Sequence, residues 1–86
     1  MGTNMTYKDA KDFLYIAENA YNIGAFAESA EIVRNLAFFV IDKGNGLSAV
    51  ERQTLTEEVK RAIGRFTNCP DEAIWEDTCG LIDLFR

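Results

Sequence analysis

The chain has 86 residues, of which 48% are hydrophobic, and its formal net charge is −5. This apolar content excludes a disordered chain. The length indicates a single domain over residues 1–86 with a thin core, in which residues 1–5 are expected to form a flexible start. The acidic balance disfavours direct binding to nucleic acid, because contacts to phosphate need a basic face. No apolar run approaches the roughly 18 residues of a membrane span, so a cytoplasmic protein without membrane contact is expected.

Two helices are predicted in the first half of the chain from apolar spacing and capping signals. The first begins after Thr6, which forms a variant capping box with Asp9, and it ends near Gly24. The second spans about residues 26–42, and its run LAFFVI is apolar on all sides. A helix of this kind must be covered on most sides. It is therefore expected to form the centre of the core, or to be covered on one side by a second copy of the chain.

The second half carries the clearest loop and two further helices. The loop DKGNGLS ends at Ser48, which forms a capping box with Glu51 and starts a helix that is expected to end about Phe66. The fourth helix begins with Pro70 in its first turn, and Gly80 predicts a kink or an end. No stretch alternates apolar and polar residues for long enough to form a strand. The prediction is an all-α fold, a small bundle of about four helices in up-and-down arrangement with short loops.

Residues that carry catalysis or bind metals are scarce. The chain has no histidine, which removes the commonest general base and the commonest metal ligand together. Cys69 and Cys79 lack the spacing of a disulfide framework and are expected to be structural or reduced. No glycine-rich phosphate loop is present. We therefore expect neither an enzyme nor a bound metal or cofactor.

The acidity is concentrated in the segment PDEAIWEDTCGLIDLFR. Residues 67–86 contain five acids and one base, and so carry −4 of the net charge of −5. One interpretation is an amphipathic closing helix with its acids outward. A second, compatible interpretation adds an acidic edge around a tryptophan anchor, which binds a partner with a basic surface. The predicted partner-binding residues are Asp71, Glu72, Trp75, Glu76, Asp77 and Asp83.

Two further sets of residues are candidates for binding. Lys60, Arg61 and Arg65 form a basic cluster on the predicted third helix, where they could bind an anion or form a solvated face with pairs such as Glu57–Arg61. The apolar side chains of the run LAFFVI point to more sides of the helix than one thin bundle can bury. This predicts self-association as a homodimer through Phe38, Phe39 and Val40.

One segment resembles a tetratricopeptide repeat. The sequence AENAYNIGAFAESAEIVRNLA resembles a single hairpin of that family, with Gly24, Phe26, Ser29 and Val33 near the motif's turn glycine, aromatic, small and aromatic positions. The motif's tryptophan, its first glycine and its closing proline are absent. The resemblance implies a helical-hairpin adaptor.

A second segment, LSAVERQTLTEEVKRAIG, resembles part of the 14-3-3 family, which would imply a phosphopeptide adaptor. The matching residues are Glu51, Arg52, Lys60 and Gly64. The family has paired arginines after that glycine, one of which binds phosphate, whereas this chain has Arg65-Phe66-Thr67 there. The pattern is therefore broken at the position that would contact the ligand.

These observations favour a non-catalytic acidic interaction module, an inhibitor or adaptor that binds a basic surface. One form of it is a phage-type antagonist of a host defence nuclease, whose carboxylates take the place of phosphates. The alternative is an oligomeric protein that sequesters a small anionic ligand or a nucleotide between chains through Lys60, Arg61 and Arg65. A phosphopeptide or helical-hairpin adaptor is the further alternative.

Overall fold

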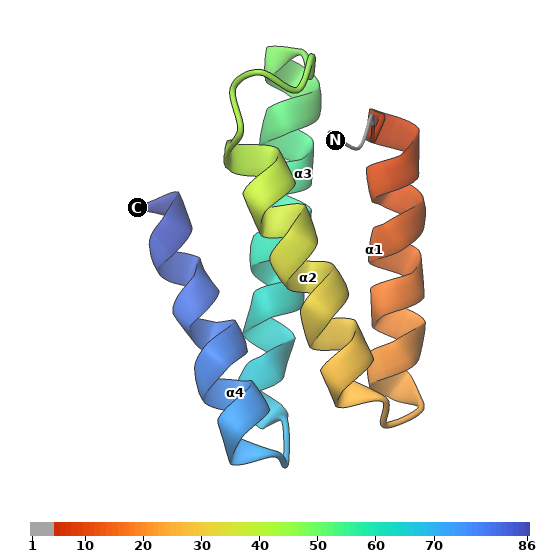
Figure 1. Ribbon diagram of the computed structural model, residues 1–86, viewed down its shortest axis with the longest axis vertical. Coiled ribbons are helices and arrows are strands. Elements are labelled where there is room, and N and C mark those ends of the chain that lie inside the picture. The colour runs from red at the N-terminus through yellow and green to blue at the C-terminus, as the bar shows by residue number, and fades with distance from the viewer. Residues whose placement is uncertain (1–4) are drawn as a thin grey trace.

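The computed structural model describes residues 5–86 and confirms the all-α prediction. Successive helices run up and down with short connections (Figure 1). The four α-helices and two 3₁₀ segments are α1 (Tyr7–Asn22), α2 (Phe26–Ile41), α3 (Ala49–Arg65), η1 (Phe66–Asn68), α4 (Glu72–Cys79) and η2 (Gly80–Phe85).

The helices α2 and α3 pack against each other and form the centre of the molecule. The helix α1 covers one side of this pair, and α4 with η2 covers the other side (Figure 1). Within residues 5–86, α1 and α4 do not pack against each other. The bundle therefore has two flanks on a shared centre, which we call the α1 flank (Tyr7–Asn22) and the α4 flank (Glu72–Phe85).

Local capping signals fix three of the four helix starts. Both predicted capping boxes are present, Thr6 with Asp9 before α1 and Ser48 with Glu51 before α3. At the start of α4 the cap is Asp71, whose carboxylate accepts a hydrogen bond from the Ile74 backbone at 3.2 Å. Pro70 thus precedes the helix and does not lie in its first turn, because Asp71 takes the capping position and its carboxylate accepts from a free N–H of the first turn, which proline has no side-chain acceptor to do.

The core is built mainly by the three long helices. Buried apolar residues come from α1, α2, α3 and η1, with α2 contributing the most: Ala10, Ala17, Val33, Leu36, Ala37, Val40, Leu55, Val59, Ile63 and Phe66. The predicted central place of α2 is confirmed. By contrast, Thr78 is the one buried residue of α4. The apolar side chains of the α4 flank, such as Ile74, Ile82 and Phe85, pack half-buried against this core.

The two ends of the chain differ from each other. Gly80 ends α4, which is one of the two outcomes predicted for it, and the chain continues to Phe85 as a 3₁₀ helix, whose hydrogen bonds are weaker. The expected flexible start over residues 1–5 lies outside the described residues except for Met5, which is half-buried against the core. Met5 therefore packs against the core and is not part of a flexible start.

An arginine of α3 caps the end of α2. The Arg52 guanidinium donates hydrogen bonds to the backbone carbonyls of Val40 and Asp42 and to Asn45 Oδ1. These carbonyls lie at the helix C-terminus, where they have no partner within α2 and where the helix dipole favours a cation. The sequence alone places Arg52 among the solvated charges of α3, whereas in the fold it holds the loop that joins α2 to α3.

Candidate functional site

The acidic edge lies on the α4 flank, at the surface. We define it as the five carboxylates Asp71, Glu72, Glu76, Asp77 and Asp83, all of them exposed. Asp71 caps α4, and Asp83 Oδ1 lies 3.4 Å from Arg86 Nε. Glu72, Glu76 and Asp77 form no salt bridge in the described part of the chain. The structure therefore leaves four of the five carboxylates without a basic partner in the described residues, and three of these four also make no hydrogen bond there.

Trp75 lies beside these carboxylates. Its side chain is 37% exposed, and it sits one turn from Glu72 on the same helix. A half-exposed tryptophan flanked by acids is a chemically suitable anchor for a partner that is both basic and apolar. All six predicted partner-binding residues lie on one short, exposed segment, but Trp75, Glu76 and Asp77 are consecutive on α4 and so point in different directions.

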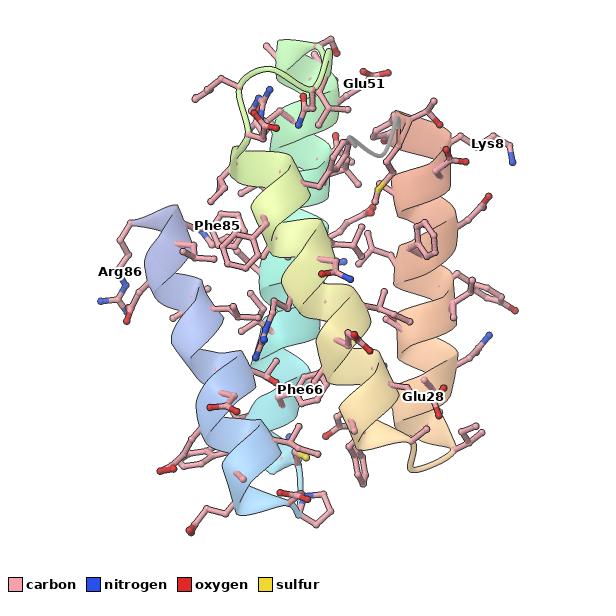
Figure 2. The ribbon with its side chains drawn as sticks, in the orientation of Figure 1. Lys8, Glu28, Glu51, Phe66, Phe85 and Arg86 are labelled. Carbon is pink, nitrogen blue, oxygen red and sulfur yellow. The ribbon has the colours of Figure 1, made fainter. Side chains whose placement is uncertain are left out.

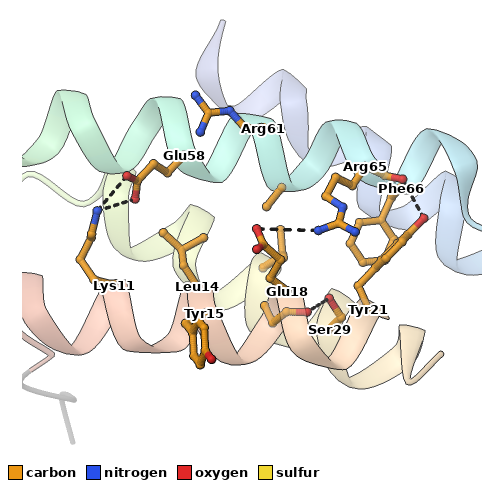
Figure 3. A pocket seen from close by; sticks show the side chains of 13 residues that line it. Lys11, Leu14, Tyr15, Glu18, Tyr21, Ser29, Glu58, Arg61, Arg65 and Phe66 are labelled. Carbon is orange, nitrogen blue, oxygen red and sulfur yellow. Dashed lines mark hydrogen bonds and ion pairs between the residues drawn. The ribbon is translucent and has the colours of Figure 1, made fainter. Parts of the chain in front are cut away.

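A cleft of about 260 Å³ lies between α1 and α3 (Figure 3). Its floor is apolar, formed by Ala17, Val33, Ala62 and Phe66, and its walls carry charged and tyrosine side chains. The residues of the walls are Lys11, Leu14, Tyr15, Glu18, Tyr21, Ser29, Glu58, Arg61 and Arg65. The cleft therefore combines an apolar base with ionic groups from two helices.

One end of the cleft is closed by an ion pair between α1 and α3. Lys11 Nζ donates to both carboxylate oxygens of Glu58, at 2.8 and 3.0 Å (Figure 3). The hydrogen bond to Glu58 raises the pKa of Lys11 above its usual value of 10.5. The same ammonium lies 5.8 Å from the centroid of the Tyr7 ring. This end of the cleft is fixed by charge-assisted hydrogen bonds.

The other end is organised around Arg65. Its Nη2 donates to Asn22 Oδ1 at 2.7 Å, and its guanidinium lies 4.8 Å from the centroid of the Tyr21 ring. Tyr21 in turn donates its hydroxyl to the Arg65 carbonyl at 2.8 Å, and burial raises the pKa of that hydroxyl. Arg65 Nη1 is 3.7 Å from a carboxylate oxygen of Glu18 (Figure 3). Asn22 and Tyr21 therefore hold the guanidinium in place, and its distance to Glu18 is longer than a hydrogen bond.

The predicted basic cluster is divided by the fold. Arg61 and Arg65 line the cleft, whereas Lys60 is exposed and lies outside its lining. In the described residues Arg61 makes no hydrogen bond or salt bridge, and Figure 3 shows its guanidinium directed away from α1. The pair Glu57–Arg61 is not formed. An anion site at this place would therefore use Arg61 and Arg65 without Lys60.

Sequence reasoning missed the contribution of α1 to this cleft. Lys11 and Glu18 face α3 together with Leu14 and Tyr21, and the four positions follow helical spacing along one side of α1. The sequence therefore did contain an indication of the cleft, because Lys11 and Glu18 interrupt the apolar side of α1. This indication could be interpreted only once α3 was known to be the neighbour.

The predicted self-association residues do not share one surface. Phe38 is 51% exposed, Phe39 is half-buried against the core, and Val40 is 1% exposed inside it. Consecutive residues of an α-helix point about 100° apart, so three in a row cannot face the same way. The exposed apolar neighbour of Phe38 on the helix is Ile41, three residues further on.

Several other chemistries find little support in residues 5–86. Both cysteines are free thiols, and burial raises the pKa of Cys79, which lowers its reactivity. No group of three or more potential metal-binding side chains comes together in this part of the chain. None of its helices combines the length and the apolar character needed to cross a bilayer.

Comparison with models of known protein families, with curated proteins and with solved structures finds no match. The likenesses to a tetratricopeptide hairpin and to a 14-3-3 segment therefore rest on the quoted residues alone. In the fold, α1 and α2 form a helical hairpin whose turn contains Gly24 at a φ of 87°, and Ser29 is buried where the helices meet. Close packing of two helices accounts for both features.

Proposed function

We propose that the protein is a non-catalytic interaction module, an inhibitor or adaptor that binds a basic surface of a partner protein through the acidic edge of the α4 flank. The observation that carries this proposal is the exposure of Glu72, Glu76 and Asp77 without a basic partner in the described residues. Glu72 and Glu76 are four residues apart on one helix, where like charges repel. The helix dipole favours the charge of Glu72 in the first turn of α4, whereas Glu76 and Asp77 lie beyond that turn and have no cation nearby in the described residues, so they are the better candidates to meet a partner's cation.

The neighbouring tryptophan adds an apolar component to this surface. Acidic groups around the rim of an interface accelerate association with a basic partner, and a central aromatic residue supplies much of the binding energy. Trp75 is exposed enough to contact a partner. A nucleic-acid-binding groove is one partner surface of this chemistry, and it would make the protein an antagonist that occupies the place of phosphates.

The first test is to replace Glu76 and Asp77 together by lysine. Because both side chains are exposed and unpaired, folding should change by less than about 0.5 kcal/mol. Binding to the partner should weaken at least tenfold, which corresponds to about 1.4 kcal/mol. Most of the loss should appear in the association rate at low salt. Surface plasmon resonance with the purified partner measures the affinity and the association rate.

A matched control is available elsewhere on the molecule. Glu31 on α2 and Glu57 on α3 are exposed, and neither forms a salt bridge in the described residues. Replacing both by lysine changes the net charge by the same amount and should leave binding within about twofold. The proposal fails if this control weakens binding as much as the acidic-edge variant does.

A second pair of variants tests the alternative basic site. The proposal also fails if Lys60→Glu with Arg61→Glu abolishes binding while the Glu76/Asp77 variant leaves binding unchanged. Competition by duplex DNA for the same partner would identify the antagonist form.

We also propose self-association through the outer face of α2, on the observation that Phe38 and Ile41 are both exposed on it. Phe38→Glu should leave the helical circular dichroism unchanged, because the side chain is half in solvent. In analytical ultracentrifugation the wild type should sediment as a dimer and the variant as a monomer. A wild type that is already monomeric at micromolar concentration contradicts this proposal without affecting the acidic edge.

A further inference from the structure

We propose that the cleft between α1 and α3 binds a small amphipathic monocarboxylate, an activity separate from that of the acidic edge. The cleft presents an oriented arginine at one end and an apolar floor between the two helices, and Arg61 lies one turn away with its guanidinium directed away from α1 (Figure 3). Each of these features corresponds to one part of such a ligand.

The oriented arginine is Arg65. Asn22 and the Tyr21 ring fix its guanidinium on two sides before any ligand arrives. Its Nη1 has only Glu18 nearby, at 3.7 Å, which is longer than a hydrogen bond. A guanidinium with free donors in a fixed plane matches a carboxylate, which it can bind through two parallel hydrogen bonds. Because the cation is already oriented, little conformational entropy is lost on binding.

The carboxylate now nearest to Arg65 is weakly held. The Glu18 side chain is 62% exposed and makes no hydrogen bond in the described residues. It can therefore move into solvent as a ligand carboxylate replaces it. Arg61 lies one turn before Arg65 and is itself exposed, so its side chain can turn from the direction seen in Figure 3 toward the cleft within nanoseconds.

The balance of charge favours one negative charge on the ligand. The cleft is lined by three cations, Lys11, Arg61 and Arg65, and by two carboxylates, Glu18 and Glu58. This leaves one positive charge in excess, which a monocarboxylate neutralises. A phosphate dianion would instead place an excess negative charge beside two glutamates.

The floor and the volume define the rest of the ligand. Ala17, Val33, Ala62 and Phe66 offer an apolar surface, which favours a hydrocarbon body over a purely polar anion. The volume of about 260 Å³ lies below the roughly 300–1,000 Å³ of typical ligand pockets. A single ring or a short branched chain fits this space, whereas a nucleotide does not. The cleft also lies within one chain, so no second copy is needed to form it.

Sodium benzoate is the probe for the test, titrated into ¹⁵N-labelled protein and followed by NMR. We expect a dissociation constant of about 1 mM, with shifts confined to the backbone around Leu14, Glu18, Ala62 and Arg65. Benzyl alcohol, which lacks the charge, and acetate, which lacks the ring, should each bind at least fivefold more weakly. Inorganic phosphate should also bind more weakly than benzoate.

The variants separate this site from a nonspecific effect of charge. Arg65→Gln should weaken benzoate binding at least tenfold, and Arg61→Gln should weaken it about threefold. Lys60→Gln, which removes an exposed charge next to Arg61 but outside the cleft, should have no effect. Glu18→Gln should tighten binding about two- to fivefold, because it removes the carboxylate that competes for Arg65.

The Glu18 variant makes the proposal independent of any folding defect in the arginine variants. An exposed Glu→Gln change conserves shape, and a damaged fold cannot increase affinity for benzoate. The proposal is overturned if benzoate gives no shifts up to about 20 mM, if the shifts lie outside the cleft, or if benzyl alcohol, acetate or phosphate binds as well as benzoate. It is also overturned if Glu18→Gln fails to tighten binding. None of these results bears on the acidic edge.

Discussion

The two flanks of the bundle are attached to the same central helices in different ways. The α1 flank is tied to them by directional polar contacts: Lys11 to Glu58 on α3, Tyr21 to the Arg65 carbonyl, and the Ser29 hydroxyl of α2 to the Ala17 carbonyl at 2.7 Å. The side chains of the α4 flank make no hydrogen bond or salt bridge to α2 or α3 within residues 5–86. Half-buried apolar side chains attach that flank (Figure 2).

The way in which each flank is attached determines how firmly its helix is held and which of its charges remain free for a partner. Hydrogen bonds and ion pairs fix α1 in one register, whereas apolar contact is non-directional and tolerates small movements. Of the two charges of α1 that face α3, Lys11 is paired with Glu58, whereas Glu18 makes only a long contact with Arg65. The charges of α4 are left in solvent, where a partner can use them. The same contrast predicts that the α4 flank is the less stable of the two.

The largest effect is expected where both flanks depend on one side chain. Phe66 is 1% exposed, and its ring packs edge-on against Tyr21 with centroids 5.0 Å apart. Phe66→Ala should lower the free energy of unfolding by about 3–5 kcal/mol, because it opens a cavity in the shared core. Urea denaturation measures this. Phe13→Ala, at an exposed position on α1, is the control and should cost less than about 1 kcal/mol. Equal losses in the two variants would contradict the assigned core.

Native-state hydrogen exchange compares the flanks directly. Amides of α4 should exchange at least tenfold faster than those in the middle of α1, a difference of about 1.4 kcal/mol in opening free energy. The reasons are the eight-residue length of α4, the 3₁₀ segment that follows it and the lack of polar ties to the centre. Equal protection in the two helices would show that apolar contacts alone hold α4 as firmly as α1.

Two buried residues that carry a hydroxyl, Ser29 and Thr78, test the contribution of single hydrogen bonds between helices. Ser29 donates across to α1, so Ser29→Ala should cost about 1 kcal/mol. Thr78 is equally buried in α4, yet its hydroxyl makes no hydrogen bond to another helix in the described residues. Thr78→Val, which conserves the shape of the side chain, should therefore stay within about 0.5 kcal/mol of the wild type. Thermal unfolding of both variants measures these losses of stability. A larger loss for Thr78→Val than for Ser29→Ala would contradict the proposed difference between the flanks.

The smallest effect concerns pH. The Glu58 hydrogen bond raises the pKa of Lys11 above 10.5, so the pair stabilises the fold fully below the unfolded pKa, and this contribution is lost as the pH rises through the folded pKa. Lys11→Met should cost about 0.5 kcal/mol at pH 8, and the difference from wild type should shrink in the alkaline range. Urea melts across that range measure it. Lys8→Met removes a fully solvated pair on α1 and should change stability less. A difference that grows with pH would contradict the assignment.

Several local features of the helix ends were predicted correctly, although the four-residue pair Glu57–Arg61 was not. Both capping boxes, the helix stop at Gly24 and the end of α4 at Gly80 arise from contacts or backbone preferences within one turn. The choice between Phe38, Phe39 and Val40 was not predictable, because a helix that is apolar all round does not reveal which side its neighbours leave open.

By itself the sequence determined that the chain is helical, where the first three helices begin and end, and that five carboxylates gather near its end. These properties follow from local capping, helical periodicity and composition. Only the tertiary structure decided which charges are paired. Lys11 meets Glu58 across 47 positions of the sequence, and Arg65 meets Asn22 across 43. Such contacts exist only after α1 and α3 have become neighbours, since the short range of ion pairs and hydrogen bonds makes them a result of packing. The cleft between the two helices exists for the same reason.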